Sequence, residues 1–146
     1  MHQTPSQHAR DLTRNAAILM AIGLLTGVFV SAAMTGKANA DAHAALASHL
    51  NALLGCFWMI GVAYSMPMLR YGDTGMKRLV WITTIPNFSN WIITAVKAFL
   101  RVAGVDYVGE GKNDFIFGML TVFVVIPSFV AAGAWVYGFF GKRSGA

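Results

Sequence analysis

Charged residues are scarce in this sequence. Only 12% of the 146 residues are Asp, Glu, Lys or Arg, while 56% are hydrophobic; a soluble domain carries about 25% charged residues. Four long stretches carry no charge at all, and each has about the 20 residues that a helix needs to cross a bilayer. The composition therefore excludes an ordinary soluble domain and predicts an integral membrane protein.

Cysteine and acidic residues are also few. Cys56 is the only cysteine, which excludes an intrachain disulfide and any two-cysteine metal motif. The six Asp and Glu residues lie at the ends of the apolar stretches or between them, so the membrane segments lack the charged relay of an ion pump. A Ser-His-Asp set, a P-loop and an HExxH motif are absent as well. The basic residues form no aromatic-interleaved patch, so we expect contact with membrane lipid and no nucleic acid.

The apolar stretches predict an all-α fold, an integral membrane four-helix bundle in a single domain, residues 1–146. The tail is expected at 1–14 and the spans at about 15–36, 44–69, 79–100 and 114–141. Ala38-Asn39-Ala40 resembles a signal-peptidase site, but the apolar run before it is longer than a cleavable one of about 7–15 residues, which favours a retained helix. Residues 70–78 are expected to form a basic loop that turns at Asp73-Thr74-Gly75.

The distribution of basic residues predicts the topology. The tail, residues 70–78 and the C-terminus are rich in Lys and Arg, whereas the opposite connections hold Asp41, Asp106 and Glu110. By the positive-inside rule, the N- and C-termini are both predicted to be cytoplasmic. The expected location is the bacterial inner (cytoplasmic) membrane, as a multi-pass protein.

One histidine lies inside a predicted span. Burying the imidazole of His49 in hydrocarbon is costly, so it should face protein, either as a hydrogen-bonded structural group or as a metal ligand. Cys56, seven residues later, shares roughly the same helical face. A haem that transfers electrons usually has two strong axial ligands, and His43 at the helix entrance is a poor second one. A metal site with an open coordination position fits the sequence better.

The third span carries a polar stripe on one helical face, formed by Thr83, Asn87, Asn90 and Thr94 and continued by Lys97 and Arg101. Because lipid cannot satisfy such side chains, the stripe must line a pocket or form hydrogen bonds to another helix. In the first span, Gly23 and Gly27 form a small-xxx-small pair that allows another helix to approach closely.

Several motifs resemble those of the membrane-bound styrene oxide isomerases in order and spacing: Ile18-Leu19-Met20, Ser48-His49 with the interval to Pro67, Ser89-Asn90, and Asp114-Phe115-Ile116-Phe117. The resemblance implies a four-helix membrane protein that assembles as a homotrimer and binds haem b, with His49 as the axial ligand. It further implies that ferric haem acts as a Lewis acid on an epoxide oxygen. Ring opening to a benzylic cation and a 1,2-hydride shift then give the aldehyde, a Meinwald rearrangement.

Three positions depart from the family pattern. The family has an asparagine at the position of Gly55, and an aspartate and a tyrosine at those of Pro86 and Thr94. These departures predict a retained haem site next to a remodelled pocket for a small lipophilic epoxide. The expected site residues are His49 as metal ligand, Asn51, Gly55, Cys56 and Asn90 beside the cofactor, and Asn87, Asn90 and Thr94 in catalysis.

Two other function classes are compatible with the same residues. One is a non-catalytic haem-binding membrane protein that senses a gas or carries haem. The other is a structural four-helix protein without a cofactor, in which His49 and the polar stripe only hold helices together. The resemblance favours the isomerase.

Overall fold

The computed structural model describes residues 5–140, with side chains from Gln7 onward, and within this range the chain is helical without a strand. Four long helices follow one another. They are α1 (Pro5–Met34), α2 (Ala42–Ser65) with the short 3₁₀ turn η1 (Met66–Met68), α3 (Asp73–Leu100), and a last helix made of α4 (Gly111–Leu120), the π-helical turn η2 (Thr121–Val125) and α5 (Ile126–Phe140). The prediction of an all-α, four-helix fold is confirmed.

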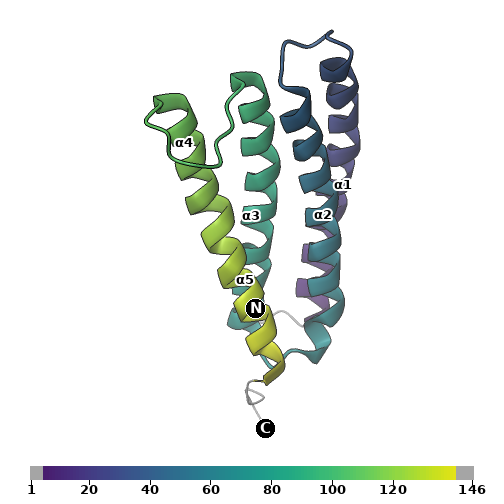
Figure 1. The fold of residues 1–146 in the computed structure, drawn as a ribbon. Coiled ribbons are helices and arrows are strands. Elements are labelled where there is room, and N and C mark those ends of the chain that lie inside the picture. The colour runs from purple at the N-terminus through teal and green to yellow at the C-terminus, as the bar shows by residue number, and fades with distance from the viewer. Residues whose placement is uncertain (1–4, 141–146) are drawn as a thin grey trace.

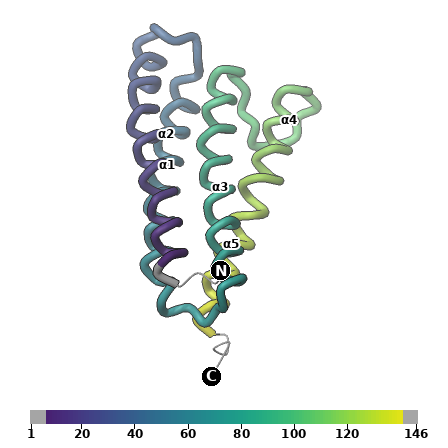
Figure 2. Tube along the Cα trace, turned by 180° about the vertical axis from the view of Figure 1, so that it is seen from behind, coloured from purple at the N-terminus to yellow at the C-terminus, as the bar shows by residue number. Residues whose placement is uncertain are grey.

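Three segments are long and apolar enough to cross a membrane: Gln7–Met34, Ala42–Met68 and Gly111–Phe140. The helix α3 is not among them, because its Thr and Asn residues lower its mean hydropathy. Figures 1 and 2 show why the fold tolerates these residues: α3 lies between the α1–α2 pair and the α4–α5 helix. Protein therefore covers α3 on both sides, as a polar helix in a membrane protein requires.

The first helix begins at Pro5, within the stretch that the sequence suggested was a tail. Here Leu12 is fully buried and the His8 side chain is only 2% exposed. The His8 Nε2 atom lies 2.8 Å from Asp73 Oδ1, in the first turn of α3. Residues 5–14 are thus held by the start of α3, a contact between distant parts of the chain; residues 1–4 lie outside the described range.

The turn expected at Asp73-Thr74-Gly75 is wrong, because these residues form the first turn of α3, which follows Gly72 as N-cap. An aspartate in this position interacts favourably with the positive end of the helix dipole. Gly75 also makes room for Tyr71, since a Cβ atom at residue 75 would lie 3.0 Å from Tyr71 Cδ1. The connection between α2 and α3 is correspondingly short.

Tyr71 ties this connection to the last helix. Its hydroxyl donates a hydrogen bond to the carbonyl oxygen of Ala134 at 2.6 Å, and the Arg70 N–H donates to the carbonyl of Gly138 at 2.9 Å. Burial raises the pKa of the Tyr71 phenol, and neighbouring Tyr137 raises it further, so the hydroxyl keeps its proton as donor. α5 is thereby anchored at the end where α1 begins (Figure 1).

The last helix widens before a proline. Pro127 has no N–H, and its ring crowds the carbonyl one turn earlier. Immediately upstream the chain forms the π-helical turn η2, where the Ile126 N–H bonds to the carbonyl of Thr121, five residues back. The helix therefore continues through Pro127 without breaking, starting at Gly111, three residues before the predicted span.

Candidate functional site

The His49 ring is fixed by a backbone carbonyl. Its Nδ1 atom lies 2.7 Å from the carbonyl oxygen of Gly23 in α1. A carbonyl only accepts hydrogen bonds, so Nδ1 carries the proton and Nε2 keeps its lone pair. Histidines that bind metals are commonly oriented in this way, through an N–H donated to a carbonyl or carboxylate. The geometry presents Nε2 of His49 as a ligand atom.

The two glycines of α1 make room for this ring. A Cβ atom at Gly27 would lie 3.4 Å from His49 Cε1, and one at Gly23 would lie 2.9 Å from the Cβ of Ala52. The close approach predicted for the small-xxx-small pair thus occurs between α1 and α2. This close approach also brings the Gly23 carbonyl to His49, which the sequence did not show.

Cys56 follows His49 by two helical turns on the same side of α2. It is 1% exposed and belongs to the main core cluster, together with Leu19 and Met59. His49 itself is only half-buried in the single chain. The cysteine therefore packs in the protein interior, while the histidine keeps part of its surface accessible.

The polar stripe of α3 faces α2. The Asn51 side-chain amide donates to Asn90 Oδ1 at 3.0 Å and to Thr94 Oγ1 at 3.2 Å, and the Thr94 hydroxyl lies 3.4 Å from the same Asn90 oxygen. One turn away, the Ser48 hydroxyl donates to the carbonyl of Trp91 at 3.0 Å. Three of the expected site residues therefore form one interhelical hydrogen-bond network, which we call the Asn51–Asn90–Thr94 network.

Gly55 and Asn87 pack against each other about one helical turn further along the α2–α3 interface. A Cβ atom at residue 55 would lie 2.6 Å from Asn87 Oδ1, so the Asn87 carboxamide fills the space beside the glycine. Asn87 is 7% exposed, and its side-chain amide donates to the carbonyl of Thr83 at 2.7 Å. Among the described residues, the Thr83 hydroxyl is the buried side-chain oxygen that has no hydrogen-bond partner.

The two groups of site residues lie on different faces of α2. His49 and Asn51 are two positions apart, which is about 200° around an α-helix, and their partners are Gly23 in α1 and Asn90 in α3. The sequence suggested that Asn90 of the stripe lies beside the cofactor that His49 would hold. Within one chain, the structure instead directs the stripe to the Asn51 side of α2 and His49 to α1.

The donor set restricts the kind of metal site that His49 can form. Across residues 5–140, His, Cys, Asp and Glu side chains do not gather in groups of three or more that could hold an ion. Within the described residues His49 therefore belongs to no such cluster, and its Nε2 atom is the ligand atom that the site offers. A cofactor that brings its own ligands to a metal, as the porphyrin of haem does, needs only one or two such atoms from the protein, so the free Nε2 atom fits it.

The contact between Gly55 and Asn87 predicts a non-additive stability effect. Gly55→Ala places a methyl group against the Asn87 carboxamide, and we expect a loss of about 1–3 kcal/mol of stability from overpacking. Asn87→Ala removes the obstructing group, so the Gly55→Ala/Asn87→Ala double variant should be more stable than the sum of the single effects predicts. Thermal unfolding of the four proteins in one detergent measures this coupling; strictly additive effects would contradict the contact.

Comparison with known proteins places the chain in a family. The model of the styrene oxide isomerase family matches residues 8–140, nearly the whole described range. Searches of curated proteins and of solved structures give no significant match. The family match includes all four helices and every residue of the candidate site. The chain belongs to the styrene oxide isomerase family.

Proposed function

We propose that this protein is a haem b-dependent membrane isomerase that converts a small lipophilic epoxide to an aldehyde or ketone. Family membership supports the epoxide-isomerase class. The haem assignment rests on the orientation of His49, whose Nδ1 donates to the Gly23 carbonyl and whose Nε2 is free. A ring nitrogen without a partner inside the protein is available to bind iron while the other nitrogen orients the ring.

In such a reaction the residues of this chain would hold the haem iron, orient its ligand and exclude water. Bound ferric haem would supply the Lewis acid that polarises an epoxide C–O bond. His49 would hold the iron through Nε2, with its ring orientation set by Gly23. The apolar helices around it would exclude water, which otherwise converts an epoxide to a diol. Rearrangement to the carbonyl product is an isomerisation, so it needs no external oxidant or reductant.

Asn51, Asn87, Asn90 and Thr94 are our candidates for shaping the substrate pocket. They are polar side chains at the α2–α3 interface, and Asn87 lies against Gly55. We further propose a homotrimer in the bacterial inner membrane as the working assembly. Because His49 is only half-buried in one chain, a second copy can cover the rest of a bound haem.

Absorption spectroscopy and an epoxide assay test this proposal together. Protein purified in detergent from haem-sufficient cells should show a Soret band, and the ferric form should convert aryl or alkyl epoxides to carbonyl compounds. Reduction with dithionite should slow the conversion, since ferrous iron is the weaker Lewis acid. A colourless protein would contradict the haem assignment, and a haem protein that turns over none of these epoxides would contradict the isomerase assignment.

One observation favours a second candidate, a haem protein without catalytic activity. The amide of Asn51 and the hydroxyl of Thr94 are satisfied within the Asn51–Asn90–Thr94 network, so they are not free to bind a substrate. A gas sensor or haem carrier would need no such donors. Carbon monoxide binding to the ferrous form, without epoxide turnover in the ferric form, would support this candidate.

A further inference from the structure

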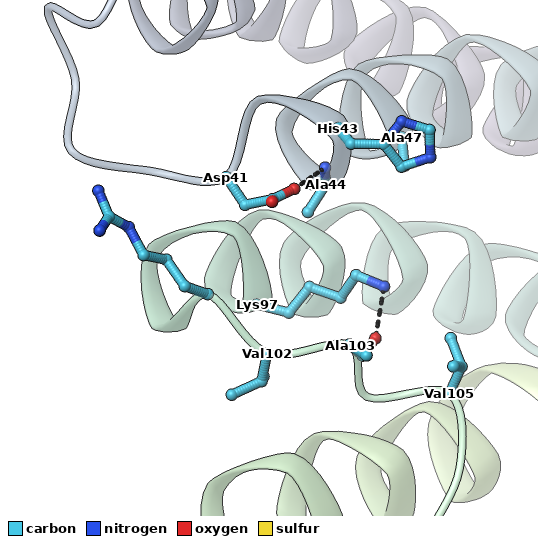
Figure 3. Close-up of a pocket in the computed structure, with 9 residues that line it drawn as sticks. Asp41, His43, Ala44, Ala47, Lys97, Val102, Ala103 and Val105 are labelled. Carbon is cyan, nitrogen blue, oxygen red and sulfur yellow. Dashed lines mark hydrogen bonds between the residues drawn. The ribbon is translucent and has the colours of Figure 1, made fainter.

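A cavity of about 470 Å³ opens between the N-terminal end of α2 and the C-terminal end of α3. Its walls include His43 and Ala47 of α2, Lys97 of α3, and Val102 and Val105 of the following connection (Figure 3). Arg101, the C-cap residue of α3, also lines it. The volume is within the range of small-ligand pockets, about 300–1,000 Å³. The cavity lies on the far side of the molecule from the Tyr71 anchor and includes no expected site residue.

Arg101 has an unusual backbone conformation. It ends α3 with φ 55°, and it is the one non-glycine residue with positive φ in the described part of the chain. Glycine is the usual residue at such a helix end, since a side chain in the left-handed conformation costs about 1–2 kcal/mol. Strained positions of this kind are concentrated at functional sites. The arginine side chain is therefore a candidate for a role that offsets the strain.

The basic side chains of the cavity have few hydrogen-bond or ion-pair partners within the protein. Lys97 Nζ donates to the carbonyl of Ala103 at 2.8 Å (Figure 3), which leaves two of its three N–H groups available. Within residues 5–140 the Arg101 guanidinium has neither a hydrogen bond nor an ion pair. The one carboxylate, Asp41, caps α2 by accepting from the Ala44 N–H. Two cations and one capping carboxylate give the cavity a positive balance.

The position of the cavity identifies the ligand chemistry. It lies at the start of the candidate span Ala42–Met68, where hydrocarbon gives way to lipid headgroups. Lys and Arg bind phosphate oxygens through charge-assisted hydrogen bonds, and Ala47, Val102 and Val105 provide apolar wall next to them. We propose that this cavity binds the headgroup of an anionic phospholipid, with Lys97 as a donor inside the cavity and the exposed Arg101 as a donor at its edge. A free phosphate ion would make no use of the apolar wall.

Arg101→Gly separates ligand binding from folding. The substitution relieves the left-handed strain, so in zwitterionic detergent the variant should be at least as stable as the unchanged protein. Wild-type protein should gain about 3 °C or more in melting temperature in phosphatidylglycerol bilayers relative to phosphatidylcholine bilayers, as linkage to a bound ligand requires. Arg101→Gly should lose most of this gain. Native mass spectrometry should show phosphatidylglycerol retained by the wild type and lost from the variant.

Lys37→Gln is the matched control, because it removes an exposed cation from the connection between α1 and α2, at the same end of the molecule. It should keep the gain in melting temperature. An equal loss in both variants would show general attraction to an anionic surface and would overturn the site. A gain produced by millimolar inorganic phosphate in detergent would overturn the assignment to lipid. The readout does not depend on haem or on turnover, so the proposed function is tested separately.

Discussion

His49→Ala is expected to fold and to contain no haem. The variant removes the Nε2 atom that we propose as the axial ligand and leaves the Gly23 carbonyl without its donor. Loss of an outer-shell partner alone weakens metal binding about 10–100-fold, so loss of the ligand itself should exceed this range. The Soret absorbance of purified protein, normalised to protein concentration, measures the effect, and circular dichroism checks that the helices remain.

His43→Ala provides the control for this experiment. This histidine lies six residues earlier on α2, in the cavity beside Lys97, and has no contact with Gly23 or Gly27. It should keep its Soret band. If His49→Ala also kept haem at the wild-type ratio, His49 would be a structural histidine and the haem-dependent mechanism would fail.

Gly23→Ala is expected to have the second largest effect, because it affects both the helix packing and the orientation of His49. The added methyl group would lie 2.9 Å from the Cβ of Ala52, an atom that cannot rotate away, so α1 must shift from α2. Overpacking of this kind costs about 1–3 kcal/mol. The shift also moves the Gly23 carbonyl from Nδ1 of His49, and we expect haem affinity to fall by about 10–100-fold. Haem titration and thermal unfolding measure the two effects.

Two further variants separate crowding from the loss of a helical glycine. At Gly118 in α4 a Cβ atom would have no neighbour within 4 Å, so Gly118→Ala should leave haem affinity unchanged and slightly stabilise the helix. Adding Ala52→Gly to Gly23→Ala removes the crowding atom and should restore most of the haem affinity. A double variant that binds haem no better than Gly23→Ala would rule out the contact with Ala52 as the cause.

The local sequence predicted the helices well but not their ends. Runs of apolar residues determine where a chain can cross a bilayer, because the cost of burying charge is local to each segment. Helix ends depend on distant partners. α1 extends back to Pro5 because His8 meets Asp73, and α3 starts at Asp73 where a turn was expected, since Tyr71 packs against Gly75 and reaches Ala134.

The polar stripe of α3 shows the same limit of prediction from local sequence, here within the candidate site. Periodicity placed Asn87, Asn90 and Thr94 on one face of α3, and the structure places this face against α2. Whether the stripe lines a pocket or forms hydrogen bonds depends on what lies opposite. Asn51 provides the partner for Asn90 and Thr94, and Gly55 the space for Asn87. A residue pattern on one helix contains no information about the partner helix.

The amino-acid sequence was enough to identify a helical membrane protein of the styrene oxide isomerase family, with His49 as its one histidine deep in a span. These features follow from composition, spacing and motif order. Three other features exist only in the packed molecule: α1 presents the Gly23 carbonyl to His49, the stripe of α3 belongs to the opposite face of α2, and Arg101 and Lys97 line one cavity. The physical reason is that hydrogen bonds and cavities form between helices, and their geometry exists only once the helices have packed.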